Sequence, residues 1–202
     1  MALALFDFDG TITTHETMPE FLHRSISRHR LIMGWLLLAP VVLGYKLGVV
    51  SGTLARRAIV RFGYRGVPAS ALVVFGRDFA QNYLPNVLRP EAVRRIAWHK
   101  AQGHTVVVVS GGLDAYLRPW CDAQGLELIC SSLQSQGGIL TGRYEGQQCV
   151  LAEKARRVHE RYDLSAYAEI YAYGDTPEDQ DLLGVATKKY YHWQEVGAMD
   201  GR

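Results

Sequence analysis

The sequence predicts an α/β protein with a Rossmann-like, doubly wound parallel sheet and a helical insertion. Short apolar runs rich in β-branched and aromatic residues occupy 2–6, 105–110 and 169–174, and a Gly- or Asp-rich turn follows each. Helical patterns separate the later runs, and strand–helix alternation with short connections is typical of a doubly wound sheet. Residues 15–85 break this alternation, because they hold helix-length apolar stretches and no good strand.

The three runs read ALALF, TVVVVS and EIYAYG. Uninterrupted apolar runs of this length suit central parallel strands that are covered on both faces. We therefore expect all three to lie inside one parallel sheet.

Three amphipathic helices are expected, at 90–103, 113–125 and 151–164. The first has Pro90 near its start and Gly103 as a natural C-cap, and Pro119 is a candidate kink in the second. The segment 131–144 fits a hairpin that turns at Gly137-Gly138.

We predict that residues 15–85 form about four helices, inserted between the first strand and the rest of the sheet. Gly34, Pro40, Gly52, Gly63, Gly66 and Pro68 divide its apolar stretches. We expect a core domain formed by 1–14 and 86–202, and an inserted helical domain at 15–85.

The composition is that of an ordinary globular protein: 202 residues, 48% hydrophobic, 21% charged and a net charge of +2. Cys121, Cys130 and Cys149 lack close spacing, which argues against a zinc site or a disulfide framework. The first apolar run begins at residue 2 without a basic segment before it, which argues against an export signal. We therefore expect a cytoplasmic protein.

Two carboxylates, Asp7 and Asp9, follow the first predicted strand in the segment FDFDGT. Ligands of open α/β sheets bind beyond the carboxyl ends of the strands, so these side chains are candidates for a functional site. The structural alternative is a turn that ends the strand, since Asp-Gly pairs are common in turns.

Three further features lie later in the chain. Ser110-Gly111-Gly112 follows the second run and could bind an anion through a hydroxyl and free backbone N–H groups. Lys154 could place a positive charge near a phosphate. Asp175 and Asp179 follow the third run and could hold a hard cation. Taken singly, these could be a plain turn, a surface lysine and a helix cap.

The order of the four features is informative, because three of them end separate predicted strands. In this order the chain resembles the haloacid dehalogenase (HAD) superfamily, subfamily IB, in the branch that contains the phosphoserine phosphatases. FDFDGT resembles its motif I, VVVVSGG motif II, Lys154 motif III and GDTPED motif IV. The resemblance implies a C1-type helical cap inserted into the core.

The resemblance also implies roles for the site residues. Asp7 would be the nucleophile, and Asp9 would protonate the leaving oxygen and then activate water. Ser110 and the Gly111 N–H would bind phosphate, with Lys154 beside Asp7. Mg²⁺ would be held by the Asp7 carboxylate, the Asp9 backbone carbonyl and Asp175, supported by Asp179. Phosphoryl transfer needs this kind of charge neutralisation.

Two residues bear on the substrate. Glu178 stands where phosphoserine phosphatases usually have an asparagine, which argues against phosphoserine itself. Glu16 lies nine residues after Asp7, where those enzymes place a glutamate that recognises the substrate ammonium. The alternative for Glu16 is a favourable charge near a helix N-terminus.

Charge is distributed unequally between the insertion and the rest of the chain. No Asp or Glu occurs from 21 to 77, and residues 15–85 carry +6, so that the remainder carries −4. The run 31–45 has no charge at all, but it falls short of the ~20 apolar residues that a spanning helix needs. One interpretation is a cap that meets an anionic membrane surface. The other is an apolar helix packed inside the cap or on a homodimer partner, with arginines such as Arg56 attracting a small phosphate.

These observations predict a Mg²⁺-dependent phosphomonoester phosphatase acting on a small phosphorylated metabolite. A phospholipid-phosphate phosphatase at the membrane surface is the main alternative. A non-catalytic phospho-ligand or membrane-binding module is a second one, although Asp7 and Asp9 argue against it. Nucleic-acid binding is not expected, because no binding motif accompanies the arginines.

Overall fold

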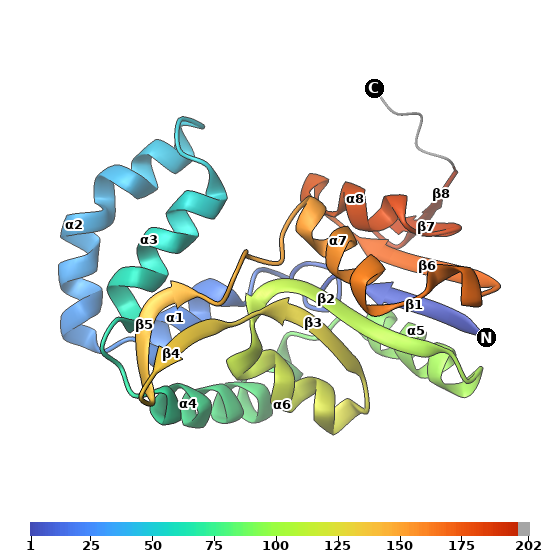
Figure 1. Cartoon of the computed structure of the whole chain (residues 1–202), viewed down its shortest axis with the longest axis horizontal. Helices are drawn as coiled ribbons and strands as arrows, with labels where there is room; N and C mark the ends of the chain where they lie inside the picture. Colours follow the sequence, from blue (N-terminus) through green and yellow to red (C-terminus); the bar gives the residue numbers. More distant parts are fainter. Residues whose placement is uncertain (198–202) are drawn as a thin grey trace.

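A computed structural model describes residues 1–197 and contains a six-stranded sheet (Figure 1). The spatial order is β3-β2-β1-β6-β7-β8, with β8 antiparallel to its neighbour and the other strands parallel. The strands are β1 (Ala2–Phe6), β2 (Thr105–Leu113), β3 (Glu127–Ser131), β6 (Glu169–Gly174), β7 (Lys188–Tyr191) and β8 (Gln194–Val196). The predicted α/β class with a parallel central sheet is confirmed.

Helices cover both faces of the sheet, as a doubly wound fold requires (Figure 1). Alternate residues of β1 point to opposite sides: Ala4 and Phe6 join one buried cluster, and Leu3 and Leu5 join the other. The first cluster includes side chains of α5 (Pro90–Ala101) and α6 (Asp114–Gln124). The second includes side chains of α7 (Ala152–Arg161) and α8 (Gln180–Gly184). This two-sided burial explains the uninterrupted apolar sequence of the strand.

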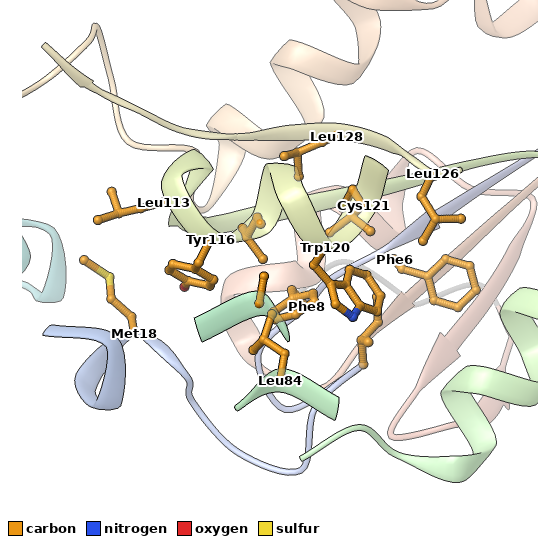
Figure 2. Packing of buried hydrophobic residues seen from close by; sticks show 14 of the residues in the cluster. Phe6, Phe8, Met18, Leu84, Leu113, Tyr116, Trp120, Cys121, Leu126 and Leu128 are labelled. Atoms are coloured by element: carbon orange, nitrogen blue, oxygen red, sulfur yellow. The ribbon is translucent and has the colours of Figure 1, made fainter. Parts of the chain in front are cut away.

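The larger cluster continues beneath the carboxyl end of β1. Phe8 packs edge-on against Trp120 of α6, with ring centroids 5.2 Å apart, and Leu84 lies beside them (Figure 2). Aromatic pairs favour this geometry. This packing holds Phe8 in place, and with it the two aspartates that flank it, Asp7 and Asp9.

Four helices occupy the predicted insertion: α1 (Met18–Ser25), α2 (Arg28–Lys46), α3 (Gly52–Tyr64) and α4 (Ala69–Asn82). Helices α2 and α3 form a hairpin at one end of the molecule, with α2 outermost (Figure 1). Helix α4 instead packs closely on α6, where a Cβ on Gly76 would lie 1.8 Å from the carbonyl oxygen of Ala115. The domain division at 15 and 85 stays a prediction.

A two-stranded hairpin, β4 (Leu133–Gln136) and β5 (Ile139–Tyr144), turns at Gly137-Gly138 as predicted. It joins the inserted helices, because the Gly66 N–H donates to the Leu140 carbonyl at 2.8 Å. Residues 1–197 also contain three short 3₁₀ turns, at Leu84–Asn86, Leu164–Ala166 and Pro177–Asp179.

The structure corrects several sequence-based expectations. Strand β2 runs to Leu113 rather than 110, and the helix expected at 151–164 ends at Arg161. The short strands β3, β7 and β8 were not predicted. The alternative in which the run 31–45 is buried inside the cap is wrong for most of the run. Only Gly34 and Gly44 of these residues are buried. Within residues 1–197, no helix is long and apolar enough to cross a membrane.

Candidate active site

Asp7 directly follows β1, at the side of the sheet formed by the carboxyl-terminal ends of the parallel strands, where β2 and β6 also end. Its backbone N–H donates to the Tyr173 carbonyl at 2.9 Å and continues the pairing of β1 with β6. Strand β1 lies between β2 and β6, so the loops after all three strands meet at this edge. The topology thus gathers the predicted motifs in one place.

Lys154 forms the centre of the site. Its Nζ lies 2.5 Å from Asp7 Oδ1 and 2.6 Å from Asp179 Oδ1, and all three side chains are buried. Burial disfavours the charge of Lys154, but Asp7 and Asp179 together outweigh it and raise the lysine pKa. Helix α7 therefore delivers a permanent positive charge to the carboxylate that ends β1.

Asp179 is fully engaged by its neighbours. One carboxylate oxygen accepts from Lys154, and the other accepts from the N–H groups of Asp175 and Thr176 and from the Thr176 hydroxyl. The bond from the Thr176 N–H is part of a capping box at the 3₁₀ turn after β6. Asp179 therefore fixes both the loop that carries Asp175 and the direction of Lys154.

Asp175 approaches the first loop at very short range. Its Oδ1 accepts from the Thr11 hydroxyl at 3.0 Å. Gly10 has φ +81°, and a Cβ there would lie 2.1 Å from Asp175 Oδ2. Only glycine is compatible with this contact and this backbone conformation, which explains the Asp-Gly pair in FDFDGT.

The donor set fits a hard divalent cation. Carboxylate oxygens of Asp7, Asp175 and Asp179 all lie within 4.8 Å of one another. Burial raises the pKa of Asp7, and Lys154 opposes that rise. One buried lysine cannot balance three clustered carboxylates together with Asp9, so additional positive charge would favour their ionised forms. Clustered carboxylate oxygens are ligands that Mg²⁺ accepts.

Asp9 is held apart from this cluster. Its Oδ1 accepts from the Thr17 N–H at 2.7 Å and from the Thr17 hydroxyl at 2.5 Å. Burial raises the pKa of Asp9, and the Thr17 bonds oppose that rise. A carboxyl group with a raised pKa, held in place by hydrogen bonds, suits proton transfer.

Ser110 and Gly111 lie on β2, next to β1. Phe6 pairs with Val108, so Ser110 is level with the segment that follows β1. The Ser110 hydroxyl is buried and accepts from the Gly112 N–H at 2.9 Å. A Cβ on Gly111 would lie 2.7 Å from Val150, just before α7. The end of β2 is irregular between Ser110 and Leu113, and α6 begins directly after it at Asp114.

Glu16 and Arg56 come from the inserted segment and face this edge of the sheet. Desolvation and, next, repulsion from Asp9 raise the pKa of Glu16 to about 7, although Arg56 opposes the shift. Arg56 of α3 reaches Glu178 with its Nη2, at 3.2 Å from each carboxylate oxygen. The sequence did not predict this ion pair.

The comparisons with known proteins agree with this geometry. The sequence profile of the haloacid dehalogenase-like hydrolases matches residues 4–184, which is most of the chain. The chain belongs to this hydrolase family. The predicted resemblance and the expectation of a HAD-type hydrolase are therefore confirmed.

Relatives of this HAD hydrolase are found at the levels of sequence and fold. Protein CicA of Caulobacter vibrioides is 31% identical over 193 residues, which span 94% of this chain and 85% of CicA. A Bordetella pertussis protein of unknown function has a TM-score of 0.81 at 23% identity, covering 94% of this chain and 89% of its own. A substrate-bound phosphoserine phosphatase has a TM-score of 0.65 at 21% identity, covering 94% and 84%. The two structures show a shared fold.

The site of this HAD hydrolase includes three supporting residues that the sequence analysis missed. Thr17 positions Asp9, and Thr11 positions Asp175. Arg89 Nε donates to the carbonyls of Gly10 and Thr13 at 2.8 and 3.0 Å, so it braces the loop between the aspartates and the cap. The two threonines lie within ten residues of Asp7, which is a usable signal, whereas nothing in the sequence marks Arg89.

Proposed function

We propose that this HAD hydrolase is a phosphomonoester phosphatase in which Asp7 forms an aspartyl-phosphate intermediate. The observation that carries the proposal is the buried contact of Lys154 with Asp7 and Asp179 at the carboxyl end of β1. This contact keeps one carboxylate oriented and beside a positive charge, as attack on an anionic phosphate requires. Phosphoserine phosphatases among the structures of similar fold support the same class of reaction.

In the first step, a carboxylate oxygen of Asp7 attacks phosphorus, and the bond between phosphorus and the substrate oxygen breaks. Asp9 gives its proton to the departing oxygen, so an alcohol leaves and Asp9 becomes anionic. Ser110 and the Gly111 N–H bind the phosphoryl oxygens, and Lys154 offsets their charge. The hydrogen bonds from Thr17 hold Asp9 in place for this transfer.

In the second step, water attacks the phosphorus of phospho-Asp7. Asp9 accepts a proton from that water, and the bond between Asp7 and phosphorus breaks to release inorganic phosphate. The proton removed from water restores the acid form of Asp9, so the cycle closes without another reactant. The raised pKa of Asp9 suits both directions of transfer.

We propose Mg²⁺ as the cofactor, held by the Asp7 carboxylate, the Asp9 backbone carbonyl and Asp175. Asp179 would support the site from behind, since both of its oxygens already accept hydrogen bonds. When bound, the ion would supply positive charge that offsets repulsion between the Asp7 carboxylate and the phosphate.

The proposed substrate is a small phosphorylated metabolite, with Arg56 and Glu16 facing its non-reacting part. A second candidate is a phosphomonoester carried by a lipid. It is favoured by one observation, the apolar surface that α2 of the inserted segment exposes.

A phosphatase screen tests the proposal. Purified protein with Mg²⁺ should release phosphate from p-nitrophenyl phosphate, and a panel of phosphoserine, phosphocholine, sugar phosphates and dispersed phosphatidylglycerophosphate should identify the substrate class. Asp7→Asn is the matched control, and it should lose about 100-fold or more of the activity while melting like the wild type. If Asp7→Asn keeps wild-type turnover, Asp7 is not the nucleophile. A folded wild type inactive on the whole panel would favour the binding-module alternative.

A further inference from the structure

Helix α2 exposes an unusually apolar surface. Trp35 is 83% exposed and Leu36 73% exposed, and the helix buries only Gly34 and Gly44. A surface helix normally turns a polar face to water, whereas this one is apolar nearly all round. Other exposed apolar side chains of α2 are Ile32, Met33, Leu37, Val42, Leu43 and Tyr45.

The apolar surface extends beyond α2 itself. Leu47 and Val49 in the connection to α3, and Leu54 in the first turn of α3, are also exposed. A groove of about 400 Å³ runs between the two helices, with Trp35, Val42 and Phe62 among its lining residues. Soluble monomers rarely leave so many apolar side chains together in water, and such surfaces mark interaction sites.

Basic residues lie at both ends of α2 and along α3. Arg28 and Lys46 stand at the two ends of α2. Arg57 and Arg61 are exposed on α3 at helical spacing, and the exposed Arg65 directly follows the helix. With Arg143 of β5, the first two line a cleft of about 300 Å³ that no acidic side chain lines. The segment 21–77 contains no Asp or Glu at all.

We propose that the α2–α3 hairpin docks on the surface of a bilayer that contains anionic lipids. The exposed apolar side chains of α2 would enter the boundary between headgroups and acyl chains, with Trp35 at headgroup level. The arginines of α3 would bind the lipid phosphates. Helix α2 would lie in the interface, in keeping with the lack of a spanning helix within residues 1–197.

Charge decides between a bilayer and a second copy of this chain. A two-fold pairing of α2–α3 hairpins would bring the same arginines of both copies together, and residues 21–77 offer no carboxylate to neutralise them. An anionic bilayer presents the opposite charge and an apolar layer at the same surface. The proposal concerns this surface only, and it does not depend on the reaction at Asp7.

Flotation with vesicles tests the docking surface on the full chain. The protein should bind phosphatidylcholine vesicles with about 30% phosphatidylglycerol much more strongly than pure phosphatidylcholine, and salt should weaken the binding. The double variant Arg57→Gln/Arg61→Gln should bind about 30-fold more weakly at low salt. Its matched control is Arg94→Gln/Arg118→Gln, which removes two exposed arginines outside the hairpin and should bind like the wild type.

The apolar contribution is tested by Leu36→Asp, against Val93→Asp on α5. Both side chains are exposed, so both variants should melt like the wild type, but only Leu36→Asp should lose binding at least about tenfold. Asp7→Asn should bind vesicles like the wild type, which separates this proposal from the proposed reaction. Equal binding to neutral and anionic vesicles would overturn it. So would a stable dimer that Leu36→Asp dissociates and that binds no vesicles.

Discussion

Arg56 of α3 and Glu178 form an ion pair beside the candidate active site, with Arg56 Nη2 3.2 Å from both carboxylate oxygens of Glu178. The pair links α3 to the 3₁₀ turn that follows β6. It gives a physical reason for a glutamate at a position where a further negative charge would repel a phosphate. With Arg56 beside it, Glu178 adds no net charge to the site.

We predict opposite effects of neutralising the two partners. Arg56→Gln should raise KM about tenfold or more, because the substrate anion loses a charged donor and Glu178 is left unpaired beside the site. Glu178→Gln should lower KM by about two- to fivefold, since Arg56 is then free for the substrate. Steady-state kinetics on the best substrate of the screen measure both.

The control for this pair is Arg57→Gln, which removes the neighbouring exposed arginine and should leave KM for a soluble phosphomonoester unchanged. Both partners of the pair are partly exposed, at 27% and 41%, so each of the two substitutions should cost less than about 1 kcal/mol of stability. If both variants melt much lower than the wild type with KM unchanged, the pair is a structural link and not part of substrate recognition.

Asp9→Asn should separate the two halves of the reaction. Formation of phospho-Asp7 from p-nitrophenyl phosphate should survive, because this leaving group departs without needing a proton. Hydrolysis of the intermediate should slow about 100-fold or more, since the asparagine cannot accept a proton from water. The expected result is a burst of one p-nitrophenolate per enzyme and a phosphorylated protein that hydroxylamine cleaves. A slow steady release without a burst would contradict the assignment of Asp9.

Removal of divalent cations should abolish turnover. Dialysis against EDTA should leave the protein folded but inactive, and Mg²⁺ should restore activity and raise the melting temperature through binding to the native state. Ca²⁺ should bind without supporting turnover, because it takes more ligands at longer distances. Asp175→Asn should reduce the Mg²⁺-dependent rise in melting temperature, whereas Asp181→Asn on α8 is the control. Full activity in excess EDTA would exclude the proposed cofactor.

Much of the fold could be predicted because central strands carry a strong signal. The runs at β1, β2 and β6 are apolar at every position since both faces of the sheet are covered. Strands β7 and β8 lie at the sheet edge, are short and are rich in lysine, glutamine and tyrosine, so their sequences resemble loops. Strand β7 pairs with β6, and β8 pairs in turn with β7, and a local pattern cannot reveal either pairing.

The site shows the same division. Asp7, Asp9, Asp175 and Lys154 could be predicted because their order along the chain is informative. Other contacts that support the site could not, since Arg89 binds the loop after Asp9 and Arg56 pairs with Glu178 only after folding. The exposure of α2 was also open in the sequence, because an uncharged run is equally compatible with burial in the cap and with contact with lipid.

His99 should make the stability of this protein depend on pH. It is fully buried on α5, where its Nε2 lies 2.9 Å from the Tyr173 hydroxyl and its Nδ1 2.8 Å from Nδ1 of His104. Burial, followed by the nearby charges of His104 and Arg95, lowers the pKa of His99 to about 3. Between about pH 6.5 and 3, the unfolded chain therefore binds a proton that the folded protein does not.

Proton binding lowers the free energy of the unfolded state as the pH falls below about 6.5, so the stability of the folded protein declines toward acid. At pH 5 the effect of His99 should be about 2 kcal/mol relative to pH 7.5. His99→Gln should melt lower than the wild type at neutral pH, because it loses buried contacts, but its melting temperature should fall less between pH 7.5 and 5. His159→Gln is the control, since His159 is exposed on α7 and should leave the slope unchanged. Equal slopes for His99→Gln and the wild type would show that His99 is protonated in the folded protein, and the assignment of a buried neutral imidazole would be wrong.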